Sequence, residues 1–131
     1  MHVKSADSYR AAVALERQNS NGAANRAYYA IYQAIVGELS RAHRAEDIDP
    51  TMKERKRDPT YDGPEWRHAF CRDTNTLAKY LNLDRMERQA VKQSWSLRVR
   101  ADYLRDNVKQ EEVSEVIKDL RSLLPTLGVK I

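Results

Sequence analysis

The sequence is poor in the residues that mark disulfide-rich, turn-rich and β-sheet folds. Its 131 residues include one cysteine, four glycines and four prolines. Cys71 has no second cysteine to pair with, which excludes an internal disulfide and suits a reducing cytoplasm. Because 32% of the residues are charged and turn-forming residues are few, the composition favours helices over a β-sandwich.

Several functional signatures are also missing. No apolar run approaches the length of a membrane span, and the N-terminus has no signal-peptide pattern, so we expect a cytoplasmic protein without membrane association. The glycines are too scattered for a phosphate-binding loop. His2, His43 and His68 are isolated, so no metal site or cofactor is expected. The net charge of +4 permits contact with nucleic-acid phosphates but does not require it.

Apolar residues recur at helical spacing over five segments, 5–19, 21–43, 62–81, 84–103 and about 107–127. Pro125 is expected to end or kink the last one. Residues 45–63 lack this periodicity and are predicted to form a long polar loop, while Asp62-Gly63-Pro64-Glu65 is typical of a helix start. No segment shows the alternation of apolar and polar residues that is typical of a β-strand. The sequence therefore predicts one domain over residues 1–131, an all-α antiparallel bundle of four to five helices.

The stretch "AANRAYYAIYQA", residues 23–34, is unusual for a central helix. Its apolar stripe includes Tyr28, but Arg26, Tyr29 and Gln33 fall on a different face. Arg26 and Gln33 are two turns apart, about 10 Å along the helix axis. We interpret this face as half of a polar seam, with the ring of Tyr29 buried and its hydroxyl bonded to a polar partner. A structural explanation is that Arg26 pairs with a carboxylate from another helix.

A candidate carboxylate lies in "LRVRADYLRD", residues 97–106. Arg98 and Asp102 are one helical turn apart on one face, so Asp102 can pair with Arg98 on its own helix. Alternatively, Asp102 accepts a bidentate bond from Arg26 across the bundle. In either arrangement, these residues form a concentrated cluster of Arg, Asp and Tyr.

Two other features have a structural and a functional interpretation. His68 and Cys71 have the i, i+3 spacing of a nucleophilic pair on one helix face, but a lone cysteine is more often a small buried hydrophobe. The run "KERKR", residues 53–57, has the charge to bind a phosphate backbone, but a solvated loop is the favoured interpretation.

The signature segments resemble those of HEPN-domain proteins. "AANRAYYAIYQAIVGEL", residues 23–39, is similar to the family's signature helix, in which Asn-Arg-x-Tyr-Tyr-Ala is followed by an aromatic residue and often a histidine. "LRVRADY", residues 97–103, resembles the second signature, an arginine shortly before Ala-Asp-Tyr. "EWRHAF", residues 65–70, and "KQEEVSEVI", residues 109–117, add to the likeness. Residues 45–63 match nothing in the family.

The resemblance implies a bundle of four or five helices that is usually dimeric. The family includes metal-independent ribonucleases, toxins of toxin–antitoxin pairs and partners of small nucleotidyltransferases. Its nucleases use an arginine and a histidine that are separated by four to six intervening residues. Arg26 matches the arginine, and the position after six intervening residues is Gln33, not histidine. Glutamine cannot exchange a proton near neutral pH, so the resemblance predicts little or no RNA cleavage.

Three functional hypotheses follow. The first is a HEPN-like RNA- or nucleotide-associated component of a prokaryotic defence or toxin–antitoxin module. It would be a homodimer, with a nucleotidyltransferase-like or other small protein partner. The second is a divergent metal-independent RNase toxin that uses Arg26 with His68 or Tyr103. The third is a helical interaction module in which Arg26, Tyr29, Gln33, Arg98 and Asp102 form a structural network.

Overall fold

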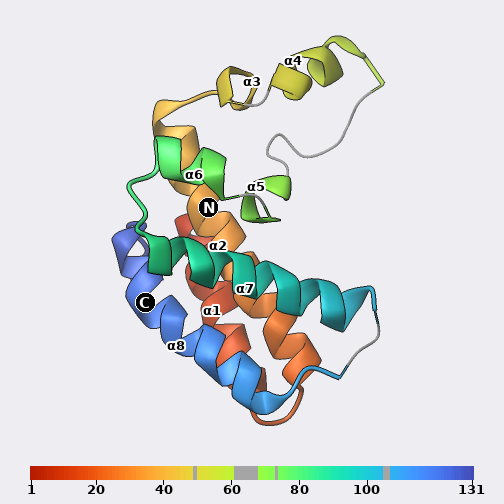
Figure 1. Cartoon of the computed structure of the whole chain (residues 1–131), viewed down its shortest axis with the longest axis vertical. Coiled ribbons are helices and arrows are strands. Elements are labelled where there is room, and N and C mark those ends of the chain that lie inside the picture. The colour runs from red at the N-terminus through yellow and green to blue at the C-terminus, as the bar shows by residue number, and fades with distance from the viewer. Residues whose placement is uncertain (49, 61–67, 73, 105–106) are drawn as a thin grey trace.

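The computed structural model describes residues 1–48, 50–60, 68–72, 74–104 and 107–131. Within these ranges the regular secondary structure is helical throughout, which confirms the all-α prediction (Figure 1). The helices are α1 (His2–Leu15), α2 (Ser20–Ala42), α3 (Ala45–Ile48), α4 (Pro50–Arg57), α5 (Ala69–Arg72), α6 (Asn75–Tyr80), α7 (Arg85–Asp102) and α8 (Gln110–Thr126). No helix in the described part of the chain has both the length and the apolar character needed to cross a membrane.

The four long helices α1, α2, α7 and α8 form the bundle, with α2 at its centre (Figure 1). Along α2 and α7, Asn25 contacts Asp102 while Tyr29 contacts Arg98, so these two helices run antiparallel. Neighbouring helices approach α2 closely because its buried side chains include many alanines. The alanines of α2 with no exposed surface are Ala23, Ala27, Ala30 and Ala34.

The ends of the long helices follow from local sequence. The tract "NSNG", residues 19–22, predicts a helix cap. Asn19 caps α2, because its side chain accepts a hydrogen bond of 2.9 Å from the backbone N–H of Gly22. At the start of α7, Asp84 and Glu87 form a reciprocal capping box. The last helix ends at Thr126, one residue after Pro125, as predicted.

The apolar spacing over residues 5–19 predicts that Ala6, Tyr9, Ala12 and Val13 face inward, and the packing of α1 differs from this prediction in part. Ala6 and Ala12 are buried, but Val13 is 38% exposed and Tyr9 is only half-buried. Ser5 and Ser8 take the inward positions instead. The hydroxyl of Ser5 donates to the backbone carbonyl of Ala30 at 2.6 Å, so a small polar residue packs without an unsatisfied group.

The prediction of a long loop over residues 45–63 is wrong in its first part, because α3 and α4 lie there. Proline fits the first position of a helix, and the lysine, glutamate, arginine and methionine of α4 are good helix formers. Met52 is fully buried and joins α4 to the core. Of the helix predicted over 62–81, the structure has α5 and α6, and the predicted start at Asp62–Glu65 lies outside the described residues.

Candidate functional site

The polar residues of α2 divide between two neighbours. Gln33 faces α1, where its side-chain oxygen accepts a hydrogen bond of 2.8 Å from the Ser8 hydroxyl. Tyr29 instead faces α7, where its hydroxyl lies 3.4 Å from Nη2 of Arg98. Arg26 is exposed. The prediction of one polar seam through Arg26, Tyr29 and Gln33 is therefore wrong.

A group of aromatic, basic and acidic side chains gathers where α2, α7 and the start of α5 meet. We call it the Tyr–Arg–His cluster. Its members are Asn25, Tyr28, Tyr29 and Tyr32 of α2, His68 before α5, and Arg98, Asp102 and Tyr103 at the end of α7.

Arg98 lies at the centre of this cluster, with its side chain 11% exposed. Its guanidinium carbon is 5.1, 5.5 and 5.1 Å from the ring centroids of Tyr28, Tyr29 and Tyr103, within the range of cation–π attraction. Nη2 donates to the Tyr103 hydroxyl at 3.0 Å. The rings and hydroxyls hold the positive charge in one place, so less entropy is lost when an anion binds.

The Nε atom of Arg98 is buried without a hydrogen bond, although it lies 3.3 Å from Oδ2 of Asp102. The two groups attract as an ion pair, but the N–H does not point along the line between them. A buried donor without an acceptor is energetically costly. The Nε–H of Arg98 is such an unsatisfied donor.

His68 is half-buried and fixed by two tyrosines. Its Nδ1 lies 2.6 Å from the Tyr28 hydroxyl, and its ring stacks on Tyr32 with centroids 4.1 Å apart. Burial, and secondarily the positive charge of Arg98, lower the pKa of His68 below its ordinary value. The imidazole is therefore neutral at pH 7, the form that can accept a proton.

Tyr28 and Cys71 form the buried wall behind His68. Burial, together with the neighbouring Cys71 thiol, raises the pKa of Tyr28 well above its ordinary range, so its hydroxyl keeps its proton. Burial also raises the pKa of Cys71 to about 12. A thiol that is fully buried and protonated is not a nucleophile, which confirms that Cys71 is a small buried hydrophobe rather than half of a His68–Cys71 pair.

The partners of Asp102 are Asn25 and Arg98 rather than Arg26. Its Oδ2 accepts a hydrogen bond of 2.8 Å from Nδ2 of Asn25 and pairs with Arg98 on its own helix. Among the described residues, no ion pair joins it to Arg26, so the predicted Arg26–Asp102 pair is wrong and the Arg98–Asp102 alternative is confirmed. Asn25, one residue before Arg26, makes the contact between the two helices.

Tyr103 closes the cluster on the solvent side. Its side chain is 64% exposed, and the adjacent Leu104 is exposed as well. Because α7 ends at Asp102, Tyr103 lies at the helix C-cap, where its hydroxyl still reaches Arg98. The cluster thus has a buried side, formed by Tyr28 and Cys71, and an accessible side, formed by Tyr103.

The structure brings together His68, Tyr29, Arg98, Asp102 and Tyr103 and leaves Arg26 and Gln33 outside. Sequence reasoning missed three members, Asn25, Tyr28 and Tyr32, of which Tyr28 was predicted to belong to the apolar core. The signal that identifies them is spacing, since residues 25, 28, 29 and 32 follow the i, i+3, i+4, i+7 pattern of one helix face.

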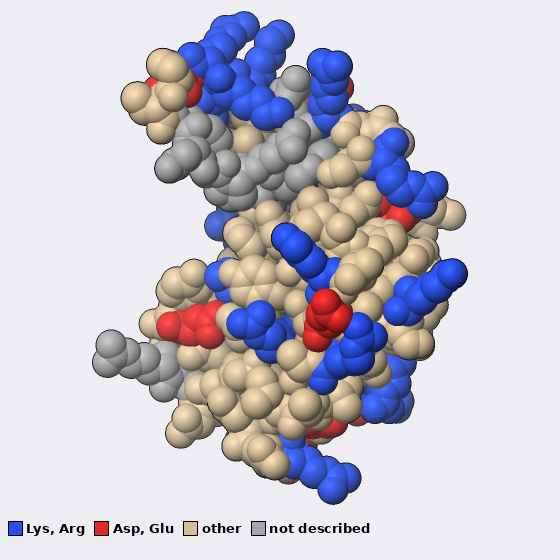
Figure 2. All heavy atoms as spheres, turned by 180° about the vertical axis from the view of Figure 1, so that it is seen from behind, with Lys and Arg blue, Asp and Glu red and all other residues tan. Residues whose placement is uncertain are grey.

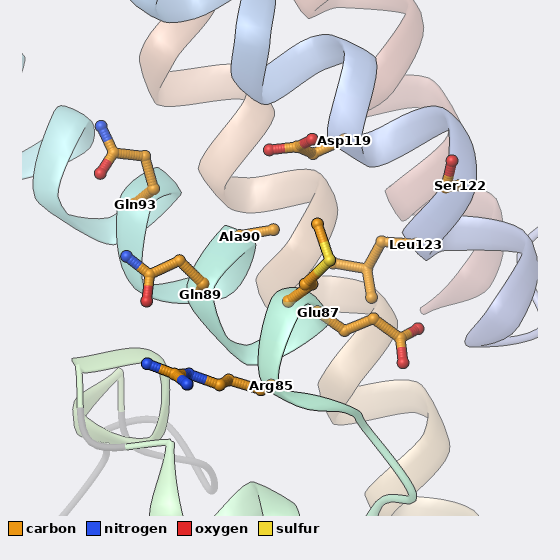
Figure 3. Close-up of a pocket in the computed structure, with 9 residues that line it drawn as sticks. Arg85, Glu87, Gln89, Ala90, Gln93, Asp119, Ser122 and Leu123 are labelled. Carbon is orange, nitrogen blue, oxygen red and sulfur yellow. The ribbon is translucent and has the colours of Figure 1, made fainter.

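A separate groove of about 750 Å³ lies between α7 and α8, away from the cluster. Figure 3 shows Arg85, Gln89 and Gln93 along one side and Asp119 and Ser122 along the other. Burial, with the nearby Glu115, raises the pKa of Asp119, but the groove contains no histidine or cysteine. Its residues do not form a catalytic set, so the Tyr–Arg–His cluster is the candidate site.

In the described part of the chain, no three His, Cys, Asp or Glu side chains are placed to hold a metal ion together. The side chains of the cluster offer the chemistry of an arginine, a neutral imidazole and tyrosine rings. Comparison with family models, with curated proteins and with solved structures found no match to this chain. The resemblance to HEPN-domain proteins therefore rests on the signature residues alone.

Proposed function

We propose that this chain is a HEPN-like, RNA-binding component of a prokaryotic defence or toxin–antitoxin module, and that RNA binds at the Tyr–Arg–His cluster. The observation that carries the proposal is the position of Arg98, whose guanidinium lies among three tyrosine rings beside His68 and below the exposed Tyr103. Guanidinium groups suit phosphate oxygens, and tyrosine rings stack on unpaired bases.

Phosphate would bind at the Nη2 side of Arg98. This nitrogen donates to the hydroxyls of Tyr103 and Tyr29 at 3.0 and 3.4 Å. A phosphate oxygen is a stronger acceptor than a neutral hydroxyl, so it can replace the hydroxyl of the exposed Tyr103. Asp102 remains on the Nε side, where it orients the guanidinium. The displaced Tyr103 ring is then free to stack on a base of the bound RNA.

A second candidate function is metal-independent RNA cleavage, and the position of His68 favours it. Nδ1 faces Tyr28, so Nε2 is the nitrogen left for a ligand, and it has no hydrogen-bond partner among the described residues. In such a reaction the 2′-hydroxyl gives its proton to Nε2 and attacks the adjacent phosphorus. The bond to the 5′-oxygen breaks, and that oxygen takes a proton from water. Arg98, rather than Arg26, would stabilise the phosphate charge.

The expectation of weak or absent cleavage now depends on His68 rather than on Gln33. Gln33 is bonded to Ser8 on the α1 side of α2 and is not part of the cluster. Weak activity follows if Nδ1 accepts a hydrogen bond from the Tyr28 hydroxyl, because Nε2 of the neutral ring then carries the hydrogen and is a donor. Strong activity requires the opposite tautomer, in which Nε2 has the free electron pair.

The experiment measures binding and cleavage of a labelled 20-nucleotide single-stranded RNA in excess EDTA. Wild type is compared with Arg98→Ala, His68→Ala and Tyr103→Ala, and Arg26→Ala is the matched arginine control from outside the cluster. We expect Arg98→Ala and Tyr103→Ala to lose at least about tenfold in affinity, and Arg26→Ala to bind like wild type. Circular dichroism establishes that each variant is folded.

The outcomes separate the hypotheses. Wild-type cleavage that is lost in His68→Ala would establish the RNase. Binding without cleavage would support the non-catalytic component. No binding of RNA or of a nucleoside monophosphate by the wild type would leave the helical interaction module, with the cluster as a structural network. The proposed homodimer is tested by light scattering, and a nucleotidyltransferase-like partner by co-purification from native lysate.

A further inference from the structure

The cationic residues of α4 are not explained by packing. Lys53, Arg55, Lys56 and Arg57 occupy four of its eight positions, and Glu54 is its only acidic residue. All five of these side chains are exposed. Among the described side chains of α4, only Met52 is buried. Met52 therefore accounts for the packing of this helix against the core, and the charged side chains do not take part in that packing.

The spacing of these charges is unfavourable for an isolated helix. Lys53, Lys56 and Arg57 are related by i, i+3 and i, i+4, so three positive charges share one side. Like charges at these spacings destabilise a helix by a few tenths of a kcal/mol per pair, roughly as much as opposite charges stabilise it. A polyanion lying along this side would interact favourably with these positive charges. Within α4 the acidic residue is Glu54, and Asp58, which follows the helix, is bonded to Thr60.

The position of α4 connects it to the cluster. Figure 1 shows α3 and α4 beyond the end of the bundle, on the side where α5 lies. Figure 2 shows Lys and Arg side chains gathered at that end of the molecule, and its outline is indented between this end and the bundle. The backbone carbonyl of His68 accepts from the Cys71 N–H in α5 at 3.0 Å, so His68 enters the cluster from this side.

We propose that α4 is a second phosphate-contact surface, and that the ligand of this protein is a single-stranded RNA long enough to reach from the cluster to α4. The inference rests on the proposed RNA site, because it extends that site. The cluster supplies aromatic faces for bases near Arg98, while the lysines and arginines of α4 contact backbone phosphates without reading sequence. A single nucleotide would occupy only the cluster.

The salt dependence of binding predicts how much α4 contributes to the affinity for RNA. Each phosphate neutralised on a single strand adds about 0.7 to the slope of log affinity against log salt concentration. Four contacts from α4 therefore add a slope of about 2.8, which corresponds to about 50-fold in affinity between 50 and 200 mM salt. Neutralising α4 removes that component and leaves the slope from Arg98.

The test uses a variant with Lys53→Gln, Arg55→Gln, Lys56→Gln and Arg57→Gln, since glutamine keeps the helix propensity and removes the charge. The matched control has the same change of net charge on the bundle. It carries four exposed cations changed to glutamine, Arg17, Lys92, Lys118 and Lys130. Affinity for the labelled 20-nucleotide RNA, and for a dinucleotide, is measured by fluorescence anisotropy at several salt concentrations, with Arg98→Ala alongside.

At each salt concentration we compare the affinity of the wild type for the 20-nucleotide RNA with that of the α4 variant. The ratio of these two affinities should be about 50-fold larger at 50 mM than at 200 mM salt. The affinity for the dinucleotide should be unchanged in the α4 variant. An α4 variant that behaves like the bundle control overturns the inference, and loss of binding in Arg98→Ala would then leave the proposed function standing. If Arg98→Ala binds like wild type while the α4 variant loses affinity, the cluster site fails instead. Wild-type binding to vesicles of phosphatidylserine and phosphatidylcholine, without binding to RNA, would overturn both.

Discussion

The two faces of α2 differ in what lies opposite them, although both carry polar residues. Asn25 and Arg26 are adjacent in sequence and about 100° apart around the helix axis. Asn25 reaches Asp102 across the bundle, while Arg26 is exposed. On the α1 face, the side-chain oxygen of Gln33 accepts a hydrogen bond from the Ser8 hydroxyl. On the α7 face, three tyrosines enclose Arg98 and His68. A polar residue on a helix therefore takes its role from the element that packs against it.

This comparison predicts the largest effect for Tyr28, the most buried residue of the cluster face. Tyr28→Ala should lower the free energy of unfolding by about 3–5 kcal/mol, because it leaves a cavity behind His68 and removes the ring beneath Arg98. Urea denaturation measures the change. Arg26→Ala, on the exposed side of the same helix, should stay within about 0.5 kcal/mol of wild type. Similar losses in the two variants would remove the distinction between the faces.

The α1 face is expected to affect stability but not RNA binding. Gln33→Ala removes the acceptor of the buried Ser8 hydroxyl, which costs about 1–3 kcal/mol if that hydroxyl finds no other acceptor. Affinity for the 20-nucleotide RNA should be unchanged in Gln33→Ala, and Gln33→His should create no new cleavage activity. RNA cleavage that appears only in Gln33→His would show that Gln33 does stand at the reacting centre.

The sequence was sufficient to predict the bundle, because that prediction needs only the apolar spacing. The alanines of α2, the "NSNG" cap and Pro125 lie where the pattern places them. The short helices α3 and α4 were missed because α4 has no apolar stripe, and one methionine is enough to hold it. Periodicity detects helices that pack along their whole length, and it misses those that touch the core at one residue.

The candidate site was only partly predictable. The residue types were recognised, and Arg98, Asp102, Tyr29, His68 and Tyr103 do lie together. The error was to assign the central arginine to α2 rather than α7. Helical spacing shows which residues share a face, but it does not show which neighbour covers that face. That information comes from packing between segments far apart in sequence.

A smaller effect would sharpen the contrast between Asn25 and Arg26. A double-mutant cycle of Asn25→Ala and Asp102→Ala should give a coupling free energy of about 0.5–1.5 kcal/mol, as expected for one hydrogen bond to a partly exposed carboxylate. The matching cycle of Arg26→Ala and Asp102→Ala should be additive within about 0.3–0.5 kcal/mol. Both are read from urea denaturation. Coupling in the second cycle but not the first would reverse the assignment of the two faces.

The smallest expected effect is the pH dependence that His68 contributes to stability. Burial and the charge of Arg98 lower the pKa of His68 in the folded protein, so the unfolded chain binds this proton more readily. The contribution is therefore fully present above the unfolded pKa of about 6.5 and is lost as the pH falls from there through the folded pKa. In His68→Gln, the free energy of unfolding should fall less than in wild type between pH 7.5 and pH 5, and the difference isolates His68 from His2 and His43. An NMR titration of the imidazole gives the folded pKa directly. A value above 6.5 would mean that the charged form is stabilised in the cluster, and the neutral imidazole required for accepting a proton would then be the minor form at pH 6.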